Sequence, residues 1–312
     1  MIISASRRTD IPAYFADWFF NRLEAGFVLV RNPMNPHQVS RVALTPDVVD
    51  GFVFWTKNPA PMLGRLGALR NYPFYFQFTL TAYGRDVEPG LPGKGEALVP
   101  TFVRLAEVIG PERVIWRYDP IFLSETYTAD YHLRWFEQLT RRLSPYTRRC
   151  TISFLDFYRG TEKRMAGLKL LPFPAEAQGA LARRLAEIAH GYGLAVDTCA
   201  EAMDLSACGI GHAHCIDGAL LSRLGGVPLA ASPDKNQRPA CGCAESIDIG
   251  AYNTCRNGCR YCYANYTPAA IAANAARHDQ RSPMLIGKVG EGDRVTERKM
   301  ASLRVEQITL DI

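Results

Sequence analysis

The stretch GFVFWTKNPAP (residues 51–61) joins a continuous apolar run to a polar turn that contains two prolines. Short runs without alternating polar residues are typical of parallel strands whose two faces are both covered. Similar runs occur at residues 1–6, 27–30, 74–80, 113–118, 150–157, 194–198 and 246–252, and amphipathic helical patterns lie between them. Strands that alternate with helices in this way predict an α/β fold, a closed (β/α) barrel of the TIM type.

The predicted barrel is a single domain over residues 1–280, and residues 281–312 form a tail to which the pattern assigns no structure. Polar or turn-forming residues follow almost every predicted strand. They are SRRTD (6–10), RNPMNP (31–36), TKNPAP (56–61), TAYGRD (81–86), RYDP (117–120), DFYRG (156–160), CAE (199–201) and TCRNGCRYC (254–262). Because the carboxyl ends of parallel strands meet at one mouth of a barrel, we expect an active site there.

The 312 residues have the composition of a globular protein, with 47% hydrophobic residues, 21% charged residues and a net charge of +5. This mild positive charge is compatible with nucleic acid or an anionic small molecule as a partner, and it requires neither. No apolar run reaches the roughly 20 residues of a membrane span, so we expect no membrane partner. The start, MIISASRRTDIP, has the pattern of a strand rather than of a signal peptide. We therefore expect a cytoplasmic protein.

Nine cysteines are present, and eight of them fall within residues 199–262. In a reducing compartment, clustered cysteines are more often metal ligands or catalytic groups than disulfides. The remaining one, Cys150, precedes the apolar run TISFL and is expected to be a small core residue.

Cys255, Cys259 and Cys262 have the spacing Cys-x3-Cys-x2-Cys, with Tyr261 directly before the last cysteine. This motif, in its strand–loop–helix setting, resembles that of the radical SAM enzymes. The resemblance implies a 4Fe-4S cluster on three thiolates, an open fourth iron that binds S-adenosylmethionine (SAM), and Tyr261 beside the adenine. Two alternatives are a zinc site, which prefers two separated ligand pairs, and an electron-transfer cluster, whose usual spacing is Cys-x2-Cys-x2-Cys.

Radical SAM enzymes place this cysteine loop after the first barrel strand, whereas here it follows the last. The resemblance therefore implies a circularly permuted barrel, in which strand 246–252 takes the first place and strand 1–6 the second, side by side. The Gly-Gly-Glu that the family carries after its second strand is not found here. By position, the residues that would contact the methionine, ribose or carboxylate of SAM are Ser6, Arg7, Arg8, Asp10, Thr56 and Lys57.

Four further cysteines are predicted at strand ends or helix starts near the same mouth. They are Cys199, Cys215, Cys241 and Cys243. Four thiolates are the ligand set of an auxiliary 4Fe-4S cluster or of a structural zinc ion, for which His212 or His214 could replace a cysteine. A third possibility is that they hold no metal, and Cys208 is left outside the set.

Arg117, Asp119 and Glu201 are the candidate catalytic residues, because they follow predicted strands. The Arg–Asp pair could bind a polar substrate or orient a proton-transfer group, and Glu201 could act as a base. The alternative is that these residues form ion pairs that hold their loops. Tyr252, Tyr263 and Tyr266 flank the cysteines, and we expect them to shield a radical from water.

The chain as a whole is similar to the DUF1848 family. The matching stretches are SRRTDIPA (6–13), FWTKNP (54–59), CID (215–217), DKNQR (234–238), CGC (241–243), DIGAYNTC (248–255) and CRYCYAN (259–265). This resemblance implies a C-terminal cysteine cluster of the radical SAM type, and it implies no known reaction.

These observations predict a radical SAM enzyme that cleaves SAM reductively and abstracts hydrogen from a small molecule or a peptide. Its electrons would come from a reducing donor such as flavodoxin or ferredoxin. A nucleic-acid substrate is an alternative, although no basic run interleaved with aromatic residues is present. Non-enzymatic alternatives are an iron–sulfur electron carrier, a redox sensor, or a binding protein stabilised by zinc.

Overall fold

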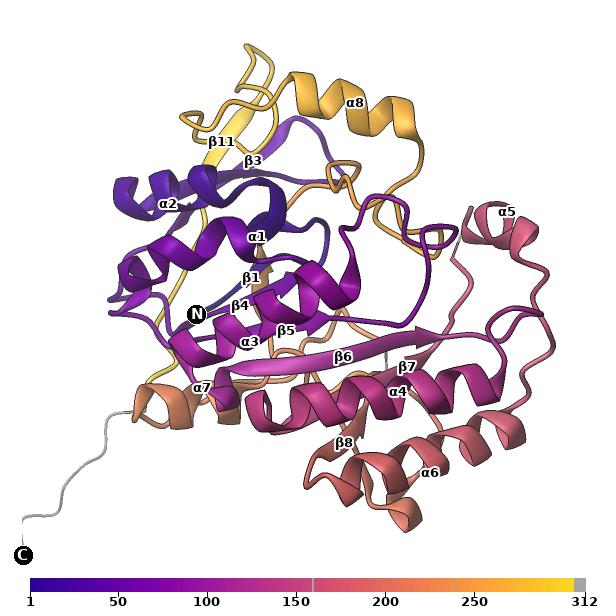
Figure 1. The fold of residues 1–312 in the computed structure, drawn as a ribbon. Helices are drawn as coiled ribbons and strands as arrows, with labels where there is room; N and C mark the ends of the chain where they lie inside the picture. Colours follow the sequence, from indigo (N-terminus) through magenta and orange to yellow (C-terminus); the bar gives the residue numbers. More distant parts are fainter. Residues whose placement is uncertain (159, 239, 306–312) are drawn as a thin grey trace, which may run out of the picture.

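The computed structural model describes residues 1–158, 160–238 and 240–305, and Figure 1 shows their fold. The main sheet has eight strands in the order β10-β1-β4-β5-β6-β7-β8-β9, and each neighbouring pair is parallel. The strands are β1 (Ile2–Ala5), β4 (Gly51–Thr56), β5 (Phe74–Thr79), β6 (Val114–Ile121), β7 (Arg149–Phe154), β8 (Ala195–Thr198), β9 (Ile210–His212) and β10 (Ser246–Asp248). The predicted α/β class is confirmed.

Both faces of the main sheet are covered, as its continuous apolar strands require. The first face carries Phe54 and Trp116. It packs against the helices α2 (Ala16–Ala25), α3 (Val99–Ile109), α4 (Ala129–Leu143) and α6 (Ala175–Gly191) (Figure 1). The second face carries Val53 and Tyr75 and packs against residues 215–221, which include the first half of α7 (Gly218–Gly225). Adjacent residues of one strand therefore point to opposite layers of the molecule.

A closed barrel is not observed. β9 and β10 are the two edges of the sheet, and no strand pairing joins them within the described residues. Between these edges the chain covers the second face of the sheet, where the amide of Ala244 donates to the carbonyl oxygen of Ile216 (2.9 Å). The three-residue strand β9 was not predicted, because IGH is too short to show a strand pattern.

A second sheet contains β2 (Phe27–Arg31), β3 (Gln38–Ala43) and β11 (Arg294–Glu297), with β3 in the centre. β3 is antiparallel to β2 and parallel to β11. The segment 27–30, predicted as a strand of the main sheet, belongs here instead, so the loop 31–36 does not line the predicted mouth. Residues beyond 280, to which the sequence assigned no structure, also pack here: Met284 bridges Leu29, and Ser282 accepts from the indole of Trp18 (3.0 Å).

Three further helices are α1 (Ile11–Tyr14), α5 (Thr161–Met165) and α8 (Pro268–Ala276). The hydroxyl of Thr267 caps α8 by accepting from the amide of Ala270 (3.1 Å), and Pro268 occupies the first turn, where its missing N–H costs nothing. No helix in the described ranges is long and apolar enough to cross a membrane.

The first and the last strand of the main sheet along the chain, β1 and β10, pair side by side, as the permuted arrangement predicts. The Asp248 carboxylate accepts from the hydroxyls of Ser4 (2.7 Å) and Ser6 (2.8 Å) and from the amide of Arg7 (2.8 Å). A Cβ at Gly250 would lie 2.0 Å from the Ser6 hydroxyl oxygen, so this close approach of the two segments requires glycine.

We expect Asp248→Ala to lower the free energy of unfolding by about 3 kcal/mol, because it leaves two buried hydroxyls and an amide without an acceptor. Urea denaturation followed by circular dichroism measures the change. The control is Asp17→Ala, whose carboxylate is 70% exposed and pairs with Arg65 at the surface; its change should stay within about 0.5 kcal/mol. Equal effects of the two substitutions would contradict this role of Asp248.

Candidate functional site

The carboxyl ends of the main-sheet strands lie at one edge, toward which the arrow of β6 points in Figure 1. The loops at this edge carry most of the predicted site residues. Residues 6–10 follow β1, Lys57 follows β4, Cys199 and Glu201 follow β8, Cys215 follows β9, and the cysteine loop (residues 255–262) follows β10. Arg117 and Asp119, predicted to follow a strand, lie within β6, which continues to Ile121. The structure thus brings side chains that are distant in sequence to a common edge.

Cys255, Cys259 and Cys262 lie close together in the cysteine loop. Burial raises the pKa of all three thiols, to about 12 for Cys259, and the neighbouring thiols raise that of Cys255 further. No three His, Cys, Asp or Glu side chains of the described residues are arranged to hold a single metal ion. A 4Fe-4S cluster places each thiolate on a different iron, and so its ligands need not converge on one point.

Asn257 ties the cysteine loop to the N-terminal part of the chain. Its side chain donates to Asp10 (3.1 Å) and accepts from the Tyr14 hydroxyl (2.6 Å), and its carbonyl accepts from the amide of Gly90 (2.9 Å). A Cβ at Gly90 would lie 2.5 and 2.7 Å from two carbonyl oxygens of the loop, so only glycine permits this approach.

Further polar contacts hold the cysteine loop from its other side. Arg164 of α5 donates to the carbonyl oxygens of Arg260 (3.1 Å) and Cys262. The Asn265 amide donates to the carbonyl oxygen of Cys255 (2.7 Å). These bonds occupy backbone groups of the loop and hold it against α5.

A buried charged network lies beside Cys259. The carboxylate of Glu88, 1% exposed, accepts from Lys57 (2.8 Å), from Lys94 (2.5 Å) and from the Tyr261 hydroxyl. Burial alone would raise the pKa of Glu88, but the two ammonium groups lower it to about 2. Burial would also lower the pKa of Lys57, but Glu88 and Cys259 raise it overall. At neutral pH this network therefore contains an ionised carboxylate and a protonated Lys57.

Lys57 is the cation of this network that acts on the cysteine loop. Burial lowers the pKa of Lys94, whereas the pKa of Lys57 is raised overall. Burial of a charge is costly unless an opposite charge or hydrogen bonds compensate it. Lys57 acts to lower the pKa of Cys259 against the effect of burial. The network therefore favours an anion at the loop, either a thiolate or the carboxylate of a ligand.

The remaining residues predicted to contact SAM differ in the hydrogen bonds and the exposure of their side chains. The Ser6 hydroxyl donates to the carboxylate of Asp248 in β10 (2.8 Å), and the Thr56 hydroxyl accepts from the amide of Asn58 (3.0 Å). Tyr261 is bonded to Glu88, and its ring centroid lies 5.4 Å from the Lys57 nitrogen. Arg7 keeps 22% of its side chain exposed. Lys57 and Arg7 are thus the charged candidates, whereas the two hydroxyls hold turns.

The four cysteines of the predicted second group also come together, on the second face of the sheet. They are Cys199, Cys215, Cys241 and Cys243. The sulfur atoms of Cys199 and Cys215 are 3.0 Å apart, and Cys241 and Cys243 pack in the same cluster. The spare cysteine, Cys208, packs with the core of the opposite face.

Arg117 joins this second group to the candidate catalytic residues. Its guanidinium donates to the Cys215 sulfur (3.0 Å) and forms a two-point ion pair with Asp119 (2.6 and 3.1 Å). The Asp119 carboxylate contributes to raising the pKa of both Lys57 and Cys199. It therefore lies within electrostatic reach of both cysteine groups.

Glu201 caps the end of a strand in this structure. Its carboxylate accepts from the amide of Phe154 at the end of β7 (2.8 Å), and burial raises its pKa. The histidines predicted as alternative ligands, His212 and His214, are both exposed.

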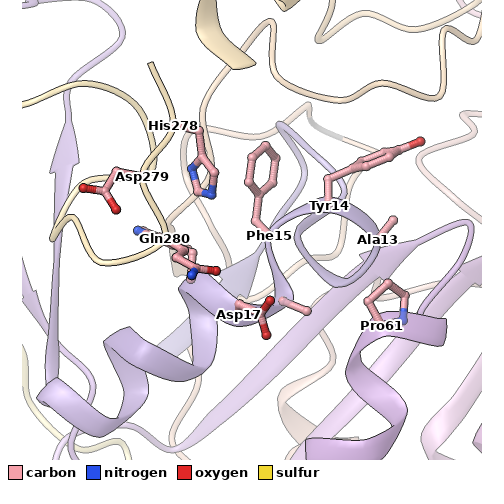
Figure 2. A pocket seen from close by; sticks show the side chains of 10 residues that line it. Ala13, Tyr14, Phe15, Asp17, Pro61, His278, Asp279 and Gln280 are labelled. Carbon is pink, nitrogen blue, oxygen red and sulfur yellow. The ribbon is translucent and has the colours of Figure 1, made fainter. Parts of the chain in front are cut away.

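A hollow of about 500 Å³ lies between α1, the start of α2 and residues 278–280, as Figure 2 shows. The rings of Phe15 and His278 in its wall are 4.8 Å apart. A second hollow, of about 460 Å³, lies between residues 69–74 and α7. Neither hollow is lined by a cysteine, so neither corresponds to the predicted mouth.

Sequence reasoning missed Glu88, Lys94, Asn257 and Asp248 as parts of the site. Glu88 and Lys94 lie in the long loop after β5, just beyond the TAYGRD segment that marks the mouth. A lysine predicted at the mouth, Lys57, is the signal that could have prompted a search for a carboxylate in the neighbouring loop.

The fold and the site define a cysteine-rich α/β protein whose sheet edge carries thiol donors suited to soft metals. The sequence profile described as "Domain of unknown function (DUF1848)" matches residues 2–264. The chain belongs to this family. A search of curated proteins found no match.

The depressed pKa of Glu88 predicts a pH-dependent contribution to stability. This contribution is present above pH 4.5, the ordinary pKa of a glutamate, and is lost as the pH falls toward about 2. We expect Glu88→Gln to destabilise the protein by about 4 kcal/mol at pH 7. The difference should shrink by roughly 2 kcal/mol by pH 3, because the glutamate of the unfolded wild-type chain is then largely protonated while the folded one still loses a proton.

Urea denaturation of both proteins between pH 7 and pH 3 measures this difference. Glu96→Gln, an exposed glutamate of the same loop, is the matched control and should show no pH-dependent difference from wild type. A difference for Glu88→Gln that stays constant over this range would show that Glu88 is not ion-paired.

Proposed function

We propose that the protein is a radical SAM enzyme, with a 4Fe-4S cluster on Cys255, Cys259 and Cys262. The observation that carries this proposal is the position of the three-cysteine loop at the carboxyl edge of a parallel sheet, next to the buried ammonium group of Lys57. Three thiolates leave one iron without a protein ligand. In the radical SAM enzymes that the motif resembles, SAM binds this iron. β10 would stand for the first strand of their barrel and β1 for the second.

The residues present fit such a cluster. Cys259 is buried, the other two thiols are half-buried, and the loop is held by side chains that do not need the metal. Lys57 favours the thiolate form of Cys259, which is the form that binds iron. With cluster and SAM bound, one electron from a donor such as ferredoxin or flavodoxin would yield a 5′-deoxyadenosyl radical that takes hydrogen from a substrate.

The side chains around the loop have separate roles in this proposal. Lys57 supplies the positive charge for the thiolates or for the carboxylate of SAM. The aromatic rings of Tyr83 and Tyr261, whose centroids are 6.2 Å apart, keep water from this side of the loop. Asp119 is the group placed to hold a proton of the substrate, and Arg117 orients it through two contacts.

The low exposure of Arg117 and Asp119 favours a small molecule or a peptide side chain as the substrate. Arg117 and Asp119 are 6% and 15% exposed, so a large rigid partner could not reach them. Glu201 is a weaker candidate for a base than Asp119, because its carboxylate accepts from the backbone of β7.

We expect the protein, purified without oxygen and loaded with iron and sulfide, to release 5′-deoxyadenosine when dithionite and SAM are added. Cys259→Ala should lose this activity by more than 100-fold, because the site then lacks one of its three thiolates. Chromatography of the quenched reaction measures deoxyadenosine. Cys208→Ser, a half-buried cysteine outside both groups, is the matched control and should retain activity.

Iron bound at this loop without any cleavage of SAM would instead indicate an electron carrier or redox sensor. Titration of SAM while the electron paramagnetic resonance of the reduced cluster is recorded separates these functions. A carrier would show no change in its signal, whereas an enzyme would show SAM binding even when its substrate is missing.

The position of Lys57 gives a further prediction about the reduction potential of this cluster. Lys57→Met removes a buried positive charge next to Cys259, so addition of an electron becomes harder. We expect the midpoint potential to shift to more negative values by about 60 mV, a tenfold change for one electron. A redox titration measures the shift, and the exposed Lys169→Met should leave the potential unchanged. An unchanged potential for Lys57→Met would place the cluster elsewhere.

A further inference from the structure

The second group of cysteines is assembled from three separate segments of the chain. Cys199 follows β8, Cys215 follows β9, and Cys241 and Cys243 precede β10. The sulfur atoms of Cys199 and Cys215 are 3.0 Å apart, and all four side chains pack in one cluster on the second face of the sheet. Four sulfurs from three segments that meet at one place exceed what the packing of small apolar side chains requires.

Hydrogen-bond donors point at the sulfur atoms of this group. The buried guanidinium of Arg117 donates to Cys215 (3.0 Å), and the amide of Ile216 donates to Cys243 (3.4 Å). Donors directed at sulfur stabilise thiolates, and thiolates are the form of cysteine that binds metals.

The segment that carries Cys241 and Cys243 has little regular structure to hold it. Between α7 and β10, residues 226–245 contain isolated bridges and no helix or strand among those that the structure describes. Loops of this length within a compact domain are uncommon and are usually functional. This one connects α7 to the edge strand β10, and a cross-link to residues after β8 and β9 would fix it in place.

We propose that Cys199, Cys215, Cys241 and Cys243 ligate a second metal centre, which takes a soft metal through four thiolates and is separate from the cysteine loop at 255–262. A disulfide between Cys199 and Cys215 would account for their contact, but it would leave Cys241, Cys243 and the guanidinium on Cys215 without a role. An all-thiolate set selects zinc or an iron–sulfur cluster over harder metals.

Both metals need the sulfurs farther apart than they are in this structure. No three of the described side chains are arranged around a single ion, and the 3.0 Å between the sulfurs of Cys199 and Cys215 is shorter than the spacing that a tetrahedral zinc or a 4Fe-4S cluster gives its thiolates. The side chains would therefore move apart when the metal binds, and the test below separates the two metals. Arg117 would then donate to a ligand sulfur of this centre from the second face of the sheet.

The test uses the full-length chain in which Cys255, Cys259 and Cys262 are all replaced by Ala, so that the first site contributes no metal. One sample receives ferrous iron with sulfide, and a second receives Zn²⁺; both are desalted in the presence of a weak chelator. We expect about four irons with sulfide in the first sample. If zinc is the metal, about one zinc remains in the second sample and the iron is lost.

In this background we expect Cys243→Ser to lower the retained metal at least fivefold, with Cys208→Ser as the matched control that leaves it unchanged. Retention of metal by either sample that depends on Cys243 supports the proposal. Metal content that is the same in all three proteins, or absent from both samples, would overturn it. Because the first site is absent, these results do not depend on whether the protein cleaves SAM.

A second measurement avoids substitutions at the proposed ligands. In the same triple variant, Cys199 and Cys241 are half-buried, as is Cys208. With metal bound, iodoacetamide should modify Cys208 alone among these three, and trypsin should cut slowly after the exposed Lys235. Removal of the metal by a strong chelator should expose Cys199 and Cys241 to modification and speed the cleavage at least tenfold. Equal modification of the three cysteines with and without metal would contradict the proposal.

Discussion

The parallel pairing of β10 with β1 determines where the cysteine loop lies. It aligns Ile247 with Ile3 and sets the Asp248 carboxylate against the hydroxyls of β1. Because the next strand in the sheet is β4, the loop after β10 comes within reach of Lys57 at the end of β4. The approach of Gly250 to Ser6 shows how closely the two segments fit. Without this pairing, the three thiols would have no contact with the buried cations.

Each cysteine group lies against a buried cation. Lys57 lies beside Cys259, Arg117 lies against Cys215, and Asp119 acts on Lys57 and on Cys199. Burial raises the pKa of the three thiols in the cysteine loop, and a neighbouring cation reduces the free energy needed to ionise a thiol. Metal binding at such thiols would release protons, so its affinity would depend on pH.

Much of the main sheet could be predicted from the sequence, because strands such as GFVFW and FYFQFTL are apolar throughout and must be buried on both faces. The run FVLV at 27–30 has the same pattern, yet it pairs with β3, since an apolar run does not specify its partner. The open edges between β9 and β10 could not be predicted either, because closure depends on the number and tilt of strands and not on any single segment.

The parts of the candidate site that consist of cysteines in short sequence stretches could be predicted. The parts that depend on tertiary contacts between distant loops could not. The choice of Cys199, Cys215, Cys241 and Cys243 over Cys208 followed from their positions near strand ends, and the structure brings these four together. The contact between Lys57 and Glu88 joins two loops 31 residues apart, and no local pattern indicates it. The cluster and the cosubstrate themselves stay predictions.

The order of these segments along the chain also affects how the protein forms during synthesis. Domains begin to fold from the N-terminal side as the ribosome releases them. β1 leaves the ribosome first, but its partner β10 emerges about 240 residues later, and the edge of β1 stays unpaired during this interval. A chaperone that shields β1 would therefore protect the nascent chain from aggregation, and the cysteine loop can reach its place at the sheet edge only after β1 is free to pair with β10.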